Sequence, residues 1–189
     1  DTGETVVVSG SVDTSTVGSY TLTYTATDAS GNVGTATRTV NVVDTTDPVV
    51  TVNGDNPATV ELGGTYTDAG ASVTDASGDA TLTTTGTVDP DTLGTYTITY
   101  TATDASGNSS TASRTVNVVD TTNPTITING DNPVTVELGD SYSDAGASAE
   151  DADETVTLET TSDVDSDTVG SYAVTYTATD SSGNTATAS

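Results

Sequence analysis

The 189-residue sequence contains no cysteine and no histidine. Without cysteine the chain forms neither disulfides nor thiolate metal sites, and without histidine it lacks the commonest general base and the usual zinc ligand. A serine–histidine–aspartate triad is therefore excluded. Hydrolysis by a pair of carboxylates is compatible with this composition.

Basic residues are also scarce, since the chain has 2 of them against 28 acidic residues and a formal net charge of −26. This charge disfavours nucleic acids and anionic membranes as partners, because both are polyanions. Repulsion among the acids destabilises a compact state unless cations offset it. High external salt or bound divalent cations would supply that offset, and both indicate an extracellular or cell-surface location.

Phenylalanine, tryptophan and methionine are absent, and no run of apolar residues is long enough to span a bilayer. We therefore expect no membrane insertion within this sequence. The apolar residues present are valine, alanine, leucine, isoleucine and tyrosine. Together with abundant threonine, this set favours strands over helices.

A nine-residue motif recurs along the chain. "YTATDASGN" occurs at Tyr24–Asn32 and at Tyr100–Asn108, and the near-copy "YTATDSSGN" follows at Tyr176–Asn184. Successive copies are 76 residues apart, which predicts a gapless tandem array. We expect no enzyme here, because a catalytic pair of carboxylates belongs to one specialised site and not to every repeat. The predicted domains are the last part of a first repeat (1–44), a complete second repeat (45–120) and a third repeat that lacks its last strand (121–189).

The second repeat shows the pattern of short strands without helical periodicity. Its clearest strand is 95–103, where Tyr96, Ile98 and other apolar residues alternate with threonine. The sequence "DASGN" then forms a hairpin loop, with Gly107 suited to positive φ. About seven strands without a helix predict an antiparallel β-sandwich. The expected strands lie within 48–54, 58–64, 65–75, 79–88, 95–103 and 110–120.

The run Gly94-x-Tyr96-x-Ile98 resembles the Gly-x-Tyr-x-Cys run of strand F in immunoglobulin domains. This resemblance implies that Tyr96 is a tyrosine corner and that Ile98 takes the half-cystine position. The ordered motifs "DTTDPVVTVNG", "ATVELGGTYTDAGASVTD" and "GTYTITYTATDASGN" resemble bacterial immunoglobulin-like repeats of large surface and secreted proteins, and hyalin-type repeats. The likeness implies tandem seven-stranded sandwiches that act as spacers in an adhesin, or as accessory modules beside a catalytic domain.

The sequence is also similar to cadherins, in "ATDASGN" followed by the linker run "VVDTTDP". In cadherins the corresponding acids bind calcium between domains, and calcium prefers six to eight oxygen ligands. The linkers here depart from the cadherin pattern, because the first contains two acids whereas the second has one acid and an asparagine. Acids beside an Ala-Gly-Ala bulge are further candidates. The candidate calcium ligands are Asp28, Asp44, Asp47, Asp68, Asp104, Asp120, Asn123 and Asp144.

Each of these acids has a simpler alternative. An aspartate in a turn accepts hydrogen bonds from nearby backbone N–H groups as an Asx turn. Asp75, Asp151 and most other recurring acids are expected on the solvated surface, as is the local cluster "EDADE" at Glu150–Glu154. The two arginines, Arg38 and Arg114, occupy equivalent positions, and we expect each to pair internally with a carboxylate.

These observations predict a non-catalytic structural extender of a long extracellular adhesin or surface fibre, with calcium as the expected ion at the domain junctions. Its expected partners are neighbouring repeats of the same chain. One alternative is a module that binds carbohydrate or protein beside a secreted enzyme. Another is a subunit of a self-assembling filament with homotypic contacts, in which a neighbour's strand completes the third repeat.

Overall fold

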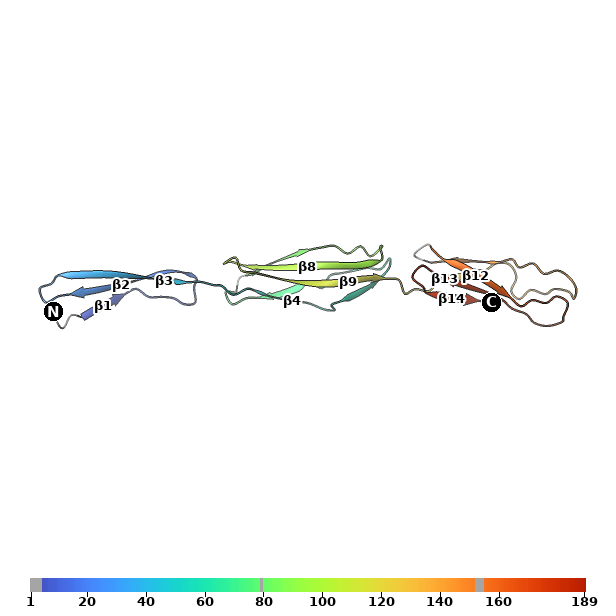
Figure 1. Ribbon diagram of the computed structural model, residues 1–189, viewed down its shortest axis with the longest axis horizontal. Coiled ribbons are helices and arrows are strands. Elements are labelled where there is room, and N and C mark those ends of the chain that lie inside the picture. Colours follow the sequence, from blue (N-terminus) through green and yellow to red (C-terminus); the bar gives the residue numbers. More distant parts are fainter. Residues whose placement is uncertain (1–4, 79, 152–154) are drawn as a thin grey trace. The chain divides into compact units, whose positions relative to one another are not determined.

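The computed structural model describes residues 5–78, 80–151 and 155–189, and every regular element in them is a β-strand (Figure 1). The all-β prediction is confirmed. The described residues include no helix that is long and apolar enough to cross a membrane. The strands are β1 (Thr5–Ser9), β2 (Gly18–Thr27), β3 (Val33–Val42), β4 (Val49–Val52), β5 (Ala58–Glu61), β6 (Ala71–Thr74), β7 (Ala80–Thr85), β8 (Gly94–Asp104), β9 (Ser109–Val119), β10 (Thr125–Ile128), β11 (Ala147–Glu150), β12 (Thr157–Ser162), β13 (Val174–Thr179) and β14 (Thr185–Ala188).

The chain divides into two compact units. The first unit comprises residues up to 52 together with 71–84 and 100–112, and the second comprises 53–70, 85–99 and 113–189. Within the first unit, β1, β2 and β3 form an antiparallel sheet with β2 at its centre. The hairpin between β2 and β3 is the first copy of the repeated nine-residue motif.

The second repeat has two sheets, a pair β4–β6 and a four-stranded sheet in the order β5-β9-β8-β7. Strand β5 runs parallel to β9, whereas β4 and β6 are antiparallel. The alternation predicted for 95–103 is confirmed, because the side chains of Ile98, Tyr100 and Ala102 are buried while the threonines between them are not. From β9, Val116 and Val118 complete this core.

Two of the expected strands are shorter than the sequence predicted. Only Ala71–Thr74 of the expected segment 65–75 is a strand, and it begins directly after Gly70, whose φ is +70°. The segment 79–88 yields the single strand β7, which ends just before Gly86 at a φ of +98°. The described part of the second repeat therefore contains six strands, β4 to β9.

The third repeat has the pair β10–β11 and the sheet β12-β13-β14. Tyr176 and Ala178 of β13 are buried, as their counterparts in β8 are. The four-residue strand β14 pairs with β13 and matches the first residues of β9. Residues 134–137, the counterpart of β5, form no strand.

The predicted tyrosine corner is confirmed and occurs in every repeat. Its phenolic hydroxyl donates a hydrogen bond to a backbone carbonyl four residues upstream, which closes the turn before the central strand. Ile98, at the half-cystine position, is buried in the core. The three bonds run from Tyr20 to Thr16 at 2.8 Å, from Tyr96 to Thr92 at 2.9 Å and from Tyr172 to Thr168 at 2.9 Å.

Candidate metal centre

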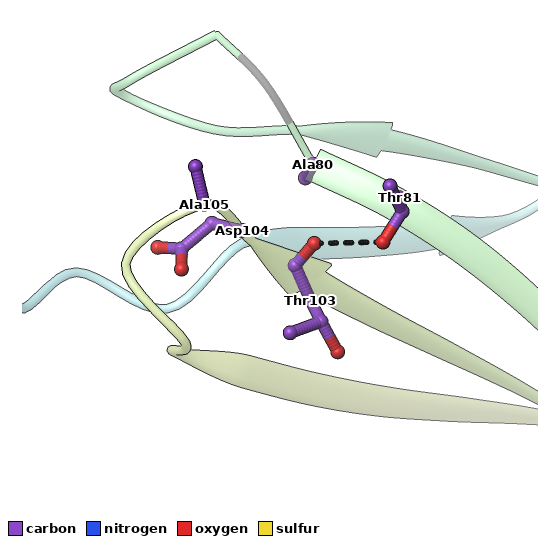
Figure 2. Close-up of a pocket in the computed structure, with 5 residues that line it drawn as sticks. All are labelled: Ala80, Thr81, Thr103, Asp104 and Ala105. Carbon is purple, nitrogen blue, oxygen red and sulfur yellow. Dashed lines mark hydrogen bonds between the residues drawn. The ribbon is translucent and has the colours of Figure 1, made fainter.

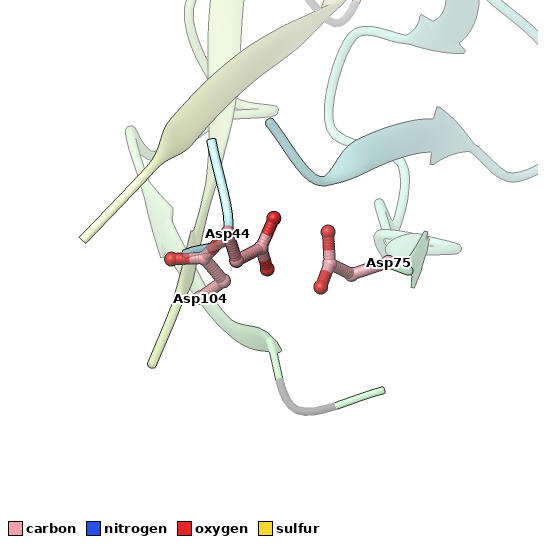
Figure 3. Close-up of side chains that lie close together, drawn as sticks. All are labelled: Asp44, Asp75 and Asp104. Carbon is pink, nitrogen blue, oxygen red and sulfur yellow. The ribbon is translucent and has the colours of Figure 1, made fainter. Parts of the chain in front are cut away.

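Three aspartates from separate parts of the chain converge in each compact unit. In the first unit they are Asp44, Asp75 and Asp104, here called the first triad (Figure 3). One carboxylate oxygen from each lies within 4.8 Å of the others. Asp44 follows β3, Asp75 directly follows β6, and Asp104 ends β8. The counterparts in the second unit, Asp120, Asp151 and Asp180, form the second triad with the same spacing limit.

The repeated "DASGN" turn holds the first triad together through Asn108. Its backbone N–H donates to Asp104 Oδ1 at 2.8 Å, and its side-chain Nδ2 donates to Asp104 Oδ2 at 2.7 Å. The same Nδ2 also donates to the backbone carbonyl of Asp44 at 3.2 Å. Asn108 thus ties the turn to the linker that precedes the second repeat.

Asn184 makes the same three bonds at the second triad. Its distances are 2.7 Å from the backbone nitrogen to Asp180 Oδ1, 2.9 Å from Nδ2 to Asp180 Oδ2 and 3.2 Å from Nδ2 to the carbonyl of Asp120. In the second and third copies of the motif, the final asparagine therefore fastens the linker to the repeat that follows.

Asp44 and Asp75 each use one carboxylate oxygen in a local turn. Asp44 Oδ1 accepts the N–H of Thr46 at 3.0 Å, and Asp75 Oδ2 accepts the N–H of Ser77 at 2.8 Å and also its hydroxyl. The remaining oxygens, Asp44 Oδ2 and Asp75 Oδ1, are buried and have no hydrogen-bond partner among the described residues. An unsatisfied buried oxygen is unfavourable unless a cation or a donor satisfies it.

The electrostatics of the first triad favour a bound cation. Hydrogen bonds from the hydroxyl and the N–H of Ser77 lower the pKa of Asp75, so that this carboxyl stays ionised at neutral pH. Asp104 is only 6% exposed. Because solvent screens buried charges poorly, three carboxylates at this separation repel one another, and a divalent cation would convert the repulsion into attraction.

The donor set fits calcium. It consists only of oxygen atoms, which hard cations prefer, and it contains no nitrogen or sulfur ligand. Two ligands bound to one calcium at about 2.4 Å can be at most about 4.8 Å apart, and the triad oxygens satisfy that limit. Carboxylates can bind in bidentate fashion, and backbone carbonyls and water supply the rest of a calcium shell.

Three of the eight predicted ligands lie outside the triads on exposed segments. Asp28 is in the first hairpin turn, where it accepts the N–H and the Nδ2 of Asn32, both at 2.8 Å. These bonds lower the pKa of Asp28. Asp47 and Asn123 are exposed linker residues. Calcium binding by these three residues stays a prediction.

Asp68 and Asp144, predicted beside a bulge, hold other partners. Asp68 forms an ion pair with Arg114, with 3.3 Å between Oδ1 and Nε, and also accepts the hydroxyl of Tyr66 at 3.2 Å. Asp144 accepts the hydroxyl of Tyr176 at 2.7 and 2.6 Å on its two oxygens. Calcium binding by Asp68 and Asp144 also stays a prediction.

Asp75 and Asp151 are members of the triads, although the sequence predicts them on the solvated surface. Their membership could have been predicted from their position directly after a strand, because that strand end lies beside the "DASGN" turn and the linker. Glu150 is the last residue of β11 and Asp151 follows it. The other two acids of the "EDADE" cluster, Asp153 and Glu154, lie outside the described residues.

The internal pairing expected of the arginines is confirmed for Arg114. Its side chain is buried, and besides Asp68 its guanidinium donates to the carbonyls of Asn53 and of Gly70, the latter at 3.3 Å. Arg38 has a different partner, because its guanidinium carbon lies 5.9 Å from the ring centre of Tyr24.

A pocket of about 300 Å³ lies next to Asp104 (Figure 2). Its lining residues are Ala80, Thr81, Thr103, Asp104 and Ala105, and the Thr81 hydroxyl donates to the carbonyl of Thr103 at 3.1 Å. None of these residues is aromatic, whereas ligand pockets are usually lined by apolar and aromatic side chains. The pocket therefore gives no support to a carbohydrate site.

The chain matches the family described as "Bacterial surface protein, Ig-like domain" over residues 1–42, 50–118 and 126–189. It is 40% identical over 193 residues to hyalin of Lytechinus variegatus. The matched region covers 91% of this chain and 36% of that protein. It is also 39% identical over 108 residues to the serine-rich adhesin for platelets of Staphylococcus aureus strain MRSA252, covering 50% of this chain and 8% of the adhesin. The chain thus spans about a third of the matched hyalin.

Among solved structures, the chain resembles protocadherin gammaB7 EC3-6 with a TM-score of 0.38 and 17% identity, covering 94% of this chain and 58% of that one. It resembles the extracellular cadherin domains 3–6 of protocadherin gamma B2 with a TM-score of 0.39 and 17% identity, covering 94% and 56%.

Proposed function

Because the chain belongs to the bacterial surface protein, Ig-like domain, family, we propose that it is a non-catalytic structural extender of a long extracellular adhesin or surface fibre, rigidified by calcium at its two triads. The observation that carries the calcium part is the convergence of three aspartates, with two buried and unsatisfied oxygens in the first triad. The repeats of this extender are 1–44, 45–120 and 121–189.

Each triad contains one aspartate from a linker and two from the body of the following repeat. A cation held by Asp44, Asp75 and Asp104 joins the linker to the ends of β6 and β8. Asn108 makes the same connection through its hydrogen bond to the Asp44 carbonyl. Calcium thereby reduces the conformational freedom of the linker, and this loss of freedom is the property that an extender requires.

The named relatives support this role. Hyalin and a serine-rich adhesin for platelets both contain segments similar to this chain. The matched segments are only part of each relative, so we do not infer that this chain binds the partners of those proteins. We infer only that it serves, as those segments do, as a part of a large surface protein.

The test is isothermal titration of calcium into the whole chain at fixed ionic strength. We expect two binding events in the wild type, one event in either Asp75→Asn or Asp151→Asn, and none in the double variant. The matched control is the pair Asp55→Asn and Asp131→Asn, which removes two charges from exposed turns at equivalent positions in the two repeats. Equal calcium binding in the triad double variant and in this control would refute the calcium part.

A further inference from the structure

Glu61, the last residue of β5, binds the linker that leaves the second repeat. Its Oε1 accepts the N–H of Thr121 at 2.6 Å and the hydroxyl of Thr122 at 2.8 Å. Its Oε2 accepts the hydroxyl of Thr121 at 2.9 Å. Both carboxylate oxygens are thus occupied by two consecutive linker residues, and these bonds lower the pKa of Glu61.

The parallel pairing of β5 with β9 explains why Glu61 reaches the linker. Glu61 is in register with Val119, and the N–H of Leu62 donates to the Val119 carbonyl at 2.7 Å. Since parallel strands end on the same side of a sheet, the chain that leaves β9 passes beside the Glu61 side chain. Charge-assisted hydrogen bonds of this kind are roughly twice as strong as neutral ones.

The residue between Val119 and this contact is Asp120, a member of the second triad. Asp120 Oδ1 accepts the N–H of Thr122 at 3.0 Å. Thr122 is therefore held by its hydroxyl at Glu61 and by its N–H at Asp120. The carboxylates of Glu61 and Asp120 therefore both bind Thr122.

We propose that Glu61 is a positioning residue that preorganises Asp120 for cation binding at the second triad. The inference rests on the calcium sites proposed above. Outer residues that orient metal ligands contribute measurably to metal affinity even though they do not touch the metal. By thermodynamic linkage, a cation at the second triad also strengthens the attachment of Thr121 and Thr122 to β5, so that the second repeat is coupled to the junction that follows it.

The first triad provides an internal comparison. Asp44 Oδ1 accepts the N–H of Thr46 at 3.0 Å, in the same turn that Asp120 makes with Thr122. Glu61 bonds to Thr121 and Thr122, which belong to the linker of the second triad. The affinity of the first triad should therefore be independent of Glu61.

The experiment measures calcium affinity by isothermal titration in two backgrounds. Asp75→Asn leaves the second triad alone, and Asp151→Asn leaves the first triad alone. Glu61→Ala should weaken calcium binding by about 3- to 10-fold in the Asp75→Asn background, which is less than the roughly 10- to 100-fold typical of groups that bond a ligand directly, because Glu61 acts through Thr122. The same substitution should change affinity by less than about twofold in the Asp151→Asn background. Glu61→Gln, which retains one acceptor oxygen, should fall between Glu61→Ala and the parent.

Two further measurements separate positioning from charge. Asp55→Ala removes the same charge from an exposed turn of the second repeat, and it should leave the affinity of the second triad unchanged. In metal-free buffer, amide hydrogen exchange of Thr121 and Thr122 should accelerate in Glu61→Ala and not in Asp55→Ala.

The outcomes distinguish this inference from the proposed function. If neither background binds calcium, the calcium sites fail, and with them the positioning role of Glu61. If both backgrounds bind calcium and Glu61→Ala leaves the second affinity unchanged, the inference is overturned while the calcium sites stand. An equal loss in both backgrounds, or after Asp55→Ala, would also overturn it, because the effect would then be one of general charge.

Discussion

The side-chain amide of Asn108 lies 3.2 Å from the backbone carbonyl of Asp44, which precedes it by 64 residues. This hydrogen bond attaches the hairpin turn after β8 to the linker that precedes β4. The same amide also holds the Asp104 carboxylate. We therefore expect Asn108 to contribute to stability even without metal.

Asn108→Ala should destabilise the chain by about 1–2 kcal/mol, because it removes two side-chain hydrogen bonds and leaves a partly buried carboxylate oxygen with fewer donors. Asn32→Ala is the matched control, since Asn32 Nδ2 donates to Asp28 on an exposed turn and has no linker carbonyl as acceptor among the described residues. Urea unfolding in chelator measures both. Equal losses would assign the Asn108 effect to the turn and not to the linker.

Calcium should raise the melting temperature of the chain, and a chelator should reverse the rise. A ligand that binds only the folded state at about 100 times its Kd stabilises it by about 2.7 kcal/mol per site, which corresponds to at least about 10 °C for domains of this size. Magnesium at the same ionic strength should give a smaller rise, because it requires a tighter octahedral site and loses water reluctantly. Differential scanning calorimetry distinguishes the ions, and equal shifts would indicate general screening.

Arg114→Met should destabilise the second repeat by about 3–5 kcal/mol, the usual cost of removing one partner from a buried ion pair. The substitution leaves Asp68 without its cation and the carbonyl of Gly70 without one donor. Arg38→Met, at the equivalent but exposed position, should cost less than about 1 kcal/mol. Urea unfolding of the two variants, followed by circular dichroism, is the measurement. A similar loss for both would contradict a special role of burial.

Tyr176 should be the last tyrosine to ionise as pH rises. Its hydrogen bond to Asp144 raises the pKa of Tyr176 to about 12, assisted by burial and by the negative charge of that carboxylate. Because the folded-state pKa is raised, the resulting stability is present below pH 10 and is lost as pH rises through about 12. Absorbance of tyrosinate near 295 nm should show a late phase that disappears in Tyr176→Phe and moves to lower pH in Asp144→Asn. A wild-type curve without this phase would refute the assignment.

Gly86→Ala should destabilise the second repeat more than Gly107→Ala. Both glycines have positive φ, +98° and +92°, so both substitutions incur backbone strain of about 1 kcal/mol. A Cβ at Gly86 would also collide with the Thr97 carbonyl oxygen, whereas one at Gly107 meets no atom within 4 Å. Thermal melts of the two variants isolate the steric part of the effect. Equal melting temperatures would mean that β7 shifts to relieve the contact.

The sequence by itself determined the all-β class, the repeat, the buried face of the clearest strand and the tyrosine corner. The alternation in Thr95–Thr103 is local, and its burial follows directly from the two-residue period of a strand. Tyr96 reaches a carbonyl only four residues away, so its role is visible in a short motif. The 76-residue spacing is arithmetic and needs no structure.

Only the tertiary structure decided which acids meet. Asp75 looks like any surface aspartate in the sequence, and it belongs to the triad because β6 ends where the linker and the β8–β9 turn also lie. Glu61 likewise reaches Thr121 through the parallel pairing of β5 with β9, a contact across 60 residues. Local patterns report which face of a strand is buried. They do not report which strand ends come together, because that depends on the order in which the sheet assembles its strands.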